Sequence, residues 1–323
     1  MPTQTSPTFA PFLIQPSLST RVWGYKDLRP WYNIVAEGDP IGEVWLTGDH
    51  CSAISGPQAG KTLGELFQQF PAEMLGTTAY PGSPLLIKML FAREKLSVQV
   101  HPDDTMAQKY GEPRGKTECW YALAAEPGAE VAAGLKPGVT LDQVRAGIHN
   151  GTLEESLQLL PVNQGDMIFV DAGTVHAIWP GAIILETQQN SDITYRMYDY
   201  GRPRELHIEK SLEATRLVTR AGKIPAQVLE DRTVLIDVDY FCVERIPVSG
   251  SRTSASMRDS DEPEHGLSYL FAAAGSARLT GEGFDPVTIP ERGIAAIPAA
   301  SPVFSVEASG NLDLVRISPR WPK

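Results

Sequence analysis

The sequence predicts a mainly β fold, and three observations support this prediction. The 323 residues include 28 Gly and 26 Pro, many of them at expected turns, which favours short strands over long helices. Several segments alternate apolar and polar residues with the period of two of a β-strand, as in LSVQVHPDD from Leu96. From about Ile224 the sequence is typical of short β segments separated by Gly, Pro and Ser. We therefore expect a larger β domain with a few short helices over residues 1–220, and a smaller β domain over residues 221–323.

Composition and charge exclude several classes of protein. The formal net charge of -11 and the pI near 5.1 argue against binding to nucleic acid or to an anionic membrane, but they allow a local basic pocket for a small anion. No apolar run is long enough to cross a bilayer, and the N-terminus lacks the features of a signal peptide. The three cysteines are few, odd in number and far apart, so we expect buried free thiols. These features together predict a cytoplasmic protein.

The strands of the larger domain are expected where apolar runs are bounded by turn residues. Two strands are expected within residues 1–50, in RVWGYKDL and IGEVWLTG. The run PLLIKMLFAREKLSVQVHP predicts two strands joined by the polar turn AREK, and KTECWYALAA predicts another. Three further strands are expected in GDMIFVDAGTVHAIW, AIILETQQ and DITYRMYDY.

Helical spacing is confined to short segments. KTLGELFQQFPAEMLG has apolar residues at helical intervals until Pro71 interrupts it, and DDTMAQKYG fits a short helix capped by an aspartate. TLDQVRAGIHNGTLEESLQLL predicts two short helices with Thr140 and Thr152 as N-caps, separated at Asn150-Gly151. LHIEKSL is typical of the start of one more helix.

Several segments carry side chains that bind metal ions. Gln99 and His101 are two apart on one face of a strand, about 7 Å apart at the backbone, so both can approach one ion. Glu118 in GKTECW and His176 in AGTVHAI are further candidates. A set of imidazole, carboxylate and amide ligands without thiolate suits a catalytic Zn²⁺ that keeps one position open, and Fe²⁺ or Mn²⁺ is the alternative.

Other charged residues stand in apolar segments, where an unpaired charge is costly. Lys116 shares a strand face with Glu118, while Glu186 and Arg196 lie on two strands separated by a turn. Arg196 has Asp192 and Asp199 as possible ion-pair partners. Lys88 interrupts LLIKML, and either a bound phosphate or a neighbouring carboxylate would compensate its charge.

The spacing from Gly165 to His176, G-x5-D-x-G-x2-H, resembles the second cupin motif, with Asp171 where that motif usually has proline. Cupins are double-sheet jelly rolls whose barrel mouth holds a metal. The resemblance therefore implies a jelly-roll domain with His176 at its metal site.

A combination of motifs between about Arg21 and Leu212 closely resembles the type I mannose-6-phosphate isomerases. QVHP and KTE are the most specific pieces, and AGTVHAI, ETQQNSDITYRMYDYGR and RELHIEKSL follow in the same order. The short span between KTECWY and GDMIFV is similar to the family's short bacterial form. The C-terminal third carries no matching motif.

This resemblance implies a role for each candidate residue. By motif, the zinc ligands would be Gln99, His101, Glu118 and His176, and Arg196 would be a catalytic residue beside the metal. Lys116 and Glu186 would be polar residues of the active site, and Lys88 and Ser97 would contact the substrate phosphate.

The implied reaction interconverts mannose 6-phosphate and fructose 6-phosphate through a cis-enediol, with a phosphorylated hexose as the partner. The general base stays open between Glu186, Lys116 and a zinc-bound water. One alternative is a cupin oxygenase in which Glu118 and two histidines hold Fe²⁺, and another is a catalytically silent sugar- or metal-binding cupin. The choice between monomer and homodimer is undecided.

Overall fold

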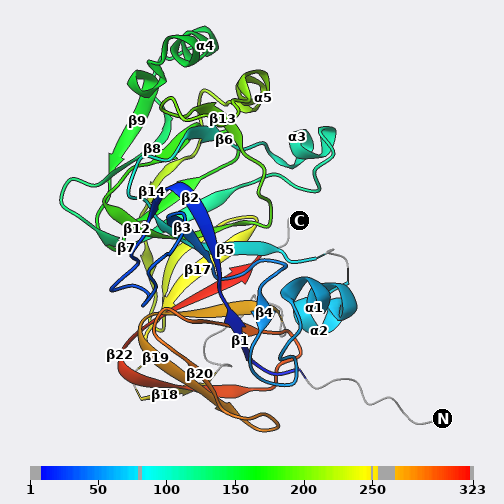
Figure 1. The fold of residues 1–323 in the computed structure, drawn as a ribbon. Helices are drawn as coiled ribbons and strands as arrows, with labels where there is room; N and C mark the ends of the chain where they lie inside the picture. The colour runs from blue at the N-terminus through cyan, green and yellow to red at the C-terminus, as the bar shows by residue number, and fades with distance from the viewer. Residues whose placement is uncertain (1–8, 79–81, 249, 254–265, 321–323) are drawn as a thin grey trace. The chain divides into compact units, whose positions relative to one another are not determined.

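The computed structural model describes residues 9–78, 82–248, 250–253 and 266–320 (Figure 1). Contacts between Cα atoms divide the chain into two compact units. One contains the described residues of Met1–Ser17, Leu46–Leu85 and Ala226–Lys323, and the other contains Leu18–Trp45 and Leu86–Pro225. The contact-based units are therefore not continuous in sequence. The domain boundary near residue 220 stays a prediction, and the contacts assign two N-terminal segments to the C-terminal unit.

The unit that contains Leu86–Pro225, here called the site unit, is built on two antiparallel sheets. Its seven-stranded sheet has the order β14-β10-β7-β12-β5-β3-β2, and its five-stranded sheet has the order β13-β6-β11-β8-β9. The strands of the first sheet are β2 (Ser17–Tyr25), β3 (Ile41–Trp45), β5 (Leu85–Phe91), β7 (Glu118–Ala125), β10 (Met167–Val170), β12 (Ala182–Gln189) and β14 (Gly222–Ile224). Those of the second are β6 (Val98–Val100), β8 (Glu130–Leu135), β9 (Leu157–Pro161), β11 (His176–Ile178) and β13 (Tyr195–Tyr198).

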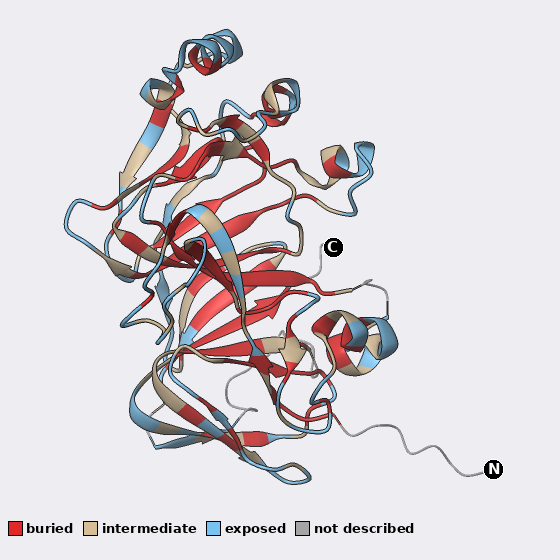
Figure 2. Ribbon diagram, viewed as in Figure 1, coloured by how far each residue is buried: buried red, intermediate tan, exposed pale blue. Residues whose placement is uncertain are grey.

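The inner faces of the two sheets share one apolar core. Trp120 and Ile168 from the seven-stranded sheet pack in the same cluster as Val131 and Ile178 from the five-stranded sheet. Strands β5, β7 and β12 are buried along most of their length (Figure 2). The site unit is therefore a two-sheet sandwich of the jelly-roll type, as the sequence predicts.

Helices cover the outer face of the five-stranded sheet. A second core joins Val98 and Val100 of β6 to Val144 and Ile148 of α4 (Leu141–Asn150), and α5 (Ile208–Ala214) contributes Leu212. Figure 1 shows α4 and α5 beside this sheet. Because Val98 and Val100 face the helices, the alternation of β6 turns Gln99 toward the other face.

The remaining elements of the site unit include one helix that the sequence predicts correctly and one that it does not. The short helix α3 (Asp104–Lys109) begins after Asp103, whose side chain accepts a hydrogen bond from Met106 N. The expected second helix after Thr152 is instead the single 3₁₀ turn η1 (Leu153–Ser156) followed by strand β9. Thr152 makes no side-chain cap, so the segment lacks a start signal, and its apolar residues pair with β8.

The other unit is a ten-stranded antiparallel sheet in the described residues, with two short helices. Its central path is β15-β16-β17-β22-β19-β21-β1-β4, with β18 on β22 and β20 on β19. The strands are β1 (Phe12–Gln15), β4 (Ser52–Ala53), β15 (Gln227–Val228), β16 (Thr233–Asp237), β17 (Phe241–Ile246), β18 (Ser251–Thr253), β19 (Ser268–Gly281), β20 (Val287–Ile289), β21 (Ile294–Ile297) and β22 (Phe304–Pro319). Two of them are longer than predicted, because β19 and β22 pass through irregular pairings without ending.

The helices of that unit, α1 (Leu63–Gln69) and α2 (Pro71–Leu75), meet at the predicted interruption. Pro71 occupies the first turn of α2, where its missing N–H costs no hydrogen bond. The cysteines Cys51, Cys119 and Cys242 are buried free thiols. Within the described part of the chain, no helix combines the length and apolarity needed to cross a membrane.

The segments that lead to the site residues pack so closely at Gly115 that a larger side chain has no room there. A Cβ at this position would lie 2.5 Å from the carbonyl oxygen of Pro102 and 2.5 Å from the carbonyl carbon of Asp103, so Gly115→Ala must push apart the segments that lead to His101 and Glu118. We expect a loss of about 1–3 kcal/mol in unfolding free energy, measured by urea denaturation. Gly38→Ala is the control, because its added Cβ has no atom within 4 Å. Equal destabilisation of the two variants would contradict the packing.

Candidate metal centre and active site

The site residues lie on the inner faces of the two sheets, next to the apolar core. On β5, β7, β11 and β12 a polar residue stands two positions from an apolar core residue. The pairs are Lys88 with Leu90, Glu118 with Trp120, His176 with Ile178, and Glu186 with Ile184. Since residues two apart share a strand face, these polar side chains point into the space between the sheets.

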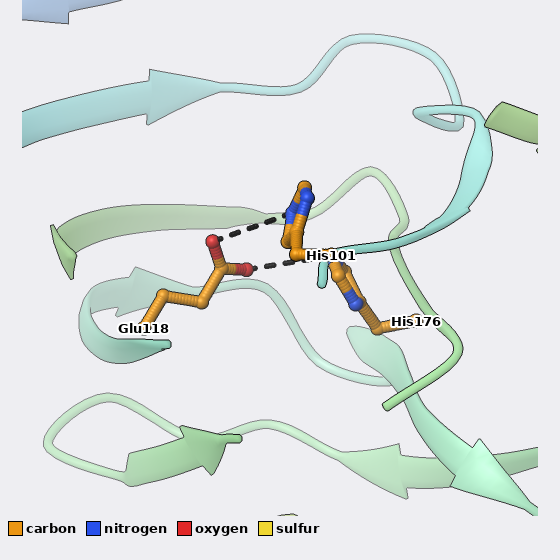
Figure 3. Close-up of side chains that lie close together, drawn as sticks. All are labelled: His101, Glu118 and His176. Atoms are coloured by element: carbon orange, nitrogen blue, oxygen red, sulfur yellow. Dashed lines mark ion pairs between the residues drawn. The ribbon is translucent and has the colours of Figure 1, made fainter. Parts of the chain in front are cut away.

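His101, Glu118 and His176 form one buried cluster (Figure 3). The Oε2 atom of Glu118 lies 3.6 Å from Nε2 of His101, and its Oε1 atom lies 3.4 Å from Nε2 of His176. The ligand atoms of the three residues all lie within 4.8 Å of one another. His101 directly follows β6, Glu118 begins β7 and His176 begins β11. The three side chains are at most 1 % exposed.

Backbone carbonyls orient both imidazole rings. Nδ1 of His101 lies 2.8 Å from the oxygen of Ile193, and Nδ1 of His176 lies 2.8 Å from the oxygen of Thr174. A carbonyl oxygen can only accept, so each Nδ1 carries the proton and each Nε2 presents a lone pair to the cluster. This is the arrangement that fixes metal-binding histidines in proteins.

Burial keeps both histidines neutral. Desolvation, followed by the positive charge of Lys116, lowers the pKa of His101 well below its usual value. Desolvation also lowers the pKa of His176 to about 4, against the opposing effect of its hydrogen bond to Thr174. Two lone pairs and a carboxylate therefore face one another at neutral pH, which is an arrangement that a cation stabilises.

Gln99 stands directly beside this cluster. Its Cα is in register with His176 on β11, and its Nε2 lies 3.3 Å from Nε2 of His176. The hydroxyl of Ser97 donates to Oε1 of Gln99 at 3.3 Å. A half-turn of the Gln99 amide would exchange its oxygen and nitrogen and bring Oε1 to the cluster. The structure thus brings all four predicted ligands together.

Lys116 supplies a positive charge next to the cluster. Its Nζ lies 2.9 Å from Oε2 of Glu118 and 3.1 Å from Nε2 of His101. Burial acts to lower the pKa of Lys116, but the carboxylates of Glu118 and Glu186 outweigh it and raise this pKa above the usual value. Lys116 is therefore an ammonium ion at neutral pH.

A cavity of about 500 Å³ opens on these residues. It is lined by Ser97, Gln99, Lys116, Glu118 and His176, and also by side chains from β2, β3, β5, β12 and the segment around β13. The latter group includes Arg21, Glu43, Lys88, Glu186, Asp192, Arg196 and Arg204. The cavity thus combines a metal-type cluster with an unusual density of charge.

Carboxylates surround Lys88. Its Nζ lies 3.6 Å from Asp192, 3.7 Å from Glu186 and 3.9 Å from Glu43, and it stands 4.6 Å from the ring centre of Trp45. Of the two partners expected for Lys88, the structure supplies carboxylates. Its contact with a substrate phosphate stays a prediction.

The two nearby glutamates have opposite pKa shifts. Burial, followed by the negative charge of Glu118, raises the pKa of Glu186. Burial acts in the same upward direction on Glu43, but the charges of Lys88 and Arg21 outweigh it and lower the pKa of Glu43. The raised pKa makes Glu186 a stronger base than an ordinary glutamate.

Arg196 lies in register with Gln99 and has neither of its two expected carboxylate partners. Its Nη1 donates to the carbonyl oxygen of Glu205 at 2.8 Å. Asp192 pairs with Lys88, and Asp199 pairs with Arg204. Among the described residues no carboxylate oxygen lies within ion-pair distance of Arg196, so its guanidinium is available to a ligand.

Several cavity residues were not predicted from the sequence. Glu43 is a buried carboxylate that accepts from Arg21 at 2.9–3.0 Å and from Trp45 at 2.6 Å. Its place in the apolar segment IGEVW is a signal that could have identified it, by the same reasoning that selected Lys88. Arg204 carries no such signal, because it stands in a polar segment.

The two-sheet fold and the buried His-Glu-His cluster define a cupin-type protein with a candidate metal centre. Residues 12–137 match the model of the phosphomannose isomerase type I catalytic domain. The chain is 37% identical over 255 residues to mannose-6-phosphate isomerase from Streptococcus mutans, covering 75% of this chain and 80% of that protein.

Similarity to proteins from Bacillus subtilis extends through most of the chain. A mannose-6-phosphate isomerase of that organism is 36% identical, with coverage of 76% of this chain and 81% of the relative. The crystal structure of the mannose 6-phosphate isomerase from Bacillus subtilis superposes with a TM-score of 0.84 at 29% identity, over 96% of this chain and 99% of that one. The chain therefore belongs to the type I phosphomannose isomerase family.

Proposed function

We propose that the chain interconverts mannose 6-phosphate and fructose 6-phosphate in the cavity of the site unit. The observation that carries this proposal is a cavity lined by Gln99, Glu118 and His176 together with Lys116, Glu186 and Arg196. His101 completes the buried cluster from beside Glu118. Membership of the family supports the same activity. The oxygenase and the silent cupin are not favoured, because the relatives at 36–37% identity are mannose-6-phosphate isomerases. The cytoplasmic location stays a prediction.

We further propose that Gln99, His101, Glu118 and His176 hold a zinc ion. Two observations support the fit of these residues to a zinc ion. Both Nε2 lone pairs face Glu118, and Oε2 of Glu118, although fully buried, accepts no hydrogen bond of good geometry. An imidazole, carboxylate and amide donor set without thiolate suits an open zinc site. A solved mannose 6-phosphate isomerase with a TM-score of 0.75 is bound with zinc and yttrium.

A zinc ion held by these four residues would supply Lewis-acid polarisation of the substrate carbonyl. The chain itself must move a proton between C2 and C1 of the sugar, and Glu186 is the carboxylate with the raised pKa. We assign the proton transfer to Glu186, since Lys116 remains protonated and cannot accept a proton. Lys116 holds Glu118 in place and adds positive charge beside the reacting oxygens.

Arg196 complements the negative charge that develops as the cis-enediol forms. Its guanidinium is always charged, lacks a carboxylate partner among the described residues, and lies on the strand paired with Gln99. A fixed cation of this kind stabilises an enediolate oxygen without exchanging protons itself.

An assay of the purified protein with mannose 6-phosphate tests the function. We expect fructose 6-phosphate to form, and chelation of the metal to lower the rate at least about 100-fold, because Lewis-acid stabilisation is worth several kcal/mol. Adding Zn²⁺ back should restore the rate. The proposal fails if the zinc-loaded protein shows no turnover. Recovery with Fe²⁺ or Mn²⁺ but not with Zn²⁺ would overturn the choice of metal alone.

The variant Arg196→Ala separates catalysis from metal binding. We expect kcat to fall by about 100- to 1,000-fold while the zinc content stays that of the wild type, because the lost group acts on the developing charge. Arg145→Ala is the matched control, since Arg145 is an exposed arginine on α4 that pairs with Glu209. Unchanged turnover in Arg196→Ala would exclude a catalytic role, and loss of zinc would show a structural one.

A further inference from the structure

The turn that follows β10, residues 171–174, is buried and lies against the chain that carries Glu118. Val170, the last residue of β10, is in register with Glu118 at the start of β7. Beside this pair, the backbone N–H of Ala172 donates to Oγ1 of Thr117 at 3.4 Å. The start of the turn is therefore tied to the segment that positions the carboxylate of the cluster.

The end of the same turn is tied to both histidines. The backbone N–H of Gly173 donates to the carbonyl oxygen of His101 at 2.8 Å. The carbonyl oxygen of Thr174 accepts the Nδ1 proton of His176 at 2.8 Å. The position of the turn thus sets the orientation of the His176 ring and the place of the His101 backbone, so a shift of the turn would separate the two Nε2 lone pairs.

The side chain of Asp171 links the two ends of this turn. The hydroxyl of Thr174 donates to Oδ1 of Asp171 at 2.9 Å, and the backbone N–H of Thr174 donates to the carbonyl oxygen of Asp171 at 3.1 Å. The backbone N–H of Arg220 is shared between Oδ1 and Oδ2 at 3.2 Å each. Because the carboxylate is 10 % exposed, few water molecules can replace these donors.

Asp171 is also the residue at which the sequence departs from the second cupin motif, where proline is usual. Proline has no side-chain acceptor, so it could bind neither the Thr174 hydroxyl nor the Arg220 N–H. The carboxylate does not belong to the His-Glu-His cluster, since its oxygens bond within the turn and to Arg220. Its contacts therefore point to a role outside the first layer of ligands.

We propose that Asp171 is a positioning residue, which holds the turn of residues 171–174 in the geometry that presents His101, Glu118 and His176 to a zinc ion. Thr174 connects the two layers, because its hydroxyl is held by Asp171 and its carbonyl oxygen orients His176. Groups that orient metal ligands from outside typically change metal affinity by about 10- to 100-fold. This inference rests on the proposed zinc centre.

The variant Asp171→Ala tests the inference through the zinc affinity of the purified protein, measured by competition with a chelator. We expect the dissociation constant for Zn²⁺ to rise about 10- to 100-fold. The visible spectrum of the Co²⁺-substituted protein should also change, since it reports the geometry of the ligands. Asp171→Asn keeps one acceptor oxygen for the Thr174 hydroxyl, so it should recover part of the affinity.

Asp166 is the matched control, because it lies in a turn at the other end of β10. Its Oδ2 accepts from the backbone N–H of Asn163 at 2.7 Å, its own N–H donates to the Asn163 carbonyl oxygen at 3.1 Å, and it pairs with Lys223 at 2.7 Å. In the described part of the chain, none of these bonds reaches a cluster residue. Asp166→Ala removes a comparable turn carboxylate and should leave the zinc affinity and the Co²⁺ spectrum unchanged.

The variant Thr174→Val removes the hydroxyl and keeps the carbonyl that orients His176. If Asp171 acts through Thr174, the double variant with Asp171→Ala should bind zinc no more weakly than Asp171→Ala alone. Should Asp171→Ala not fold, Asp171→Asn and Thr174→Val are compared with Asp166→Ala in its place.

Three results would overturn the inference: wild-type zinc affinity in the variants of Asp171, an equal loss in Asp166→Ala, or additive losses in the double variant. A wild type that binds no zinc would instead refute the proposed metal centre.

Discussion

The carboxylate of Glu118 is fully buried between two neutral imidazoles, and the rest of the site depends on satisfying it. Backbone carbonyls turn both Nε2 lone pairs toward it, so the protein has concentrated electron pairs among side chains that are almost fully buried. Such an arrangement is costly unless a cation compensates it. Lys116 supplies one positive charge, and the proposed zinc supplies the other.

The fold places this site at the end of the apolar core, where the inner faces of the two sheets change from apolar to polar residues. Trp120, Ile178 and Ile184 belong to the core, and their neighbours two positions away, Glu118, His176 and Glu186, face the cavity. Because the strands are paired in a sandwich, the ligands need no long loops to reach one ion. Carboxylates compensate Lys88, whereas Arg196 has no carboxylate within ion-pair distance among the described residues.

Local pattern was enough to predict the β fold, the polar face of LSVQVHPDD and the cap at Asp103, since strand alternation and capping depend on adjacent residues. It did not bring Gln99 and His101 to His176, because the pairing of β6 with β11 joins residues 77 positions apart. That step came from resemblance to a family. The partners of Arg196 and the place of Arg204 were missed for the same reason, as ion pairs such as Arg204 with Asp199 are chosen by tertiary geometry.

The central claim is that one zinc ion sits at the Glu118 cluster, and anomalous X-ray scattering from crystals of the purified enzyme tests it most directly. Data recorded on both sides of the zinc absorption edge would locate the metal without reference to activity. The account predicts a single zinc peak per chain within bonding distance of His101 Nε2, His176 Nε2, a Glu118 oxygen and the Gln99 amide oxygen. An active crystal without a peak there, or with zinc held elsewhere in the chain, would contradict it.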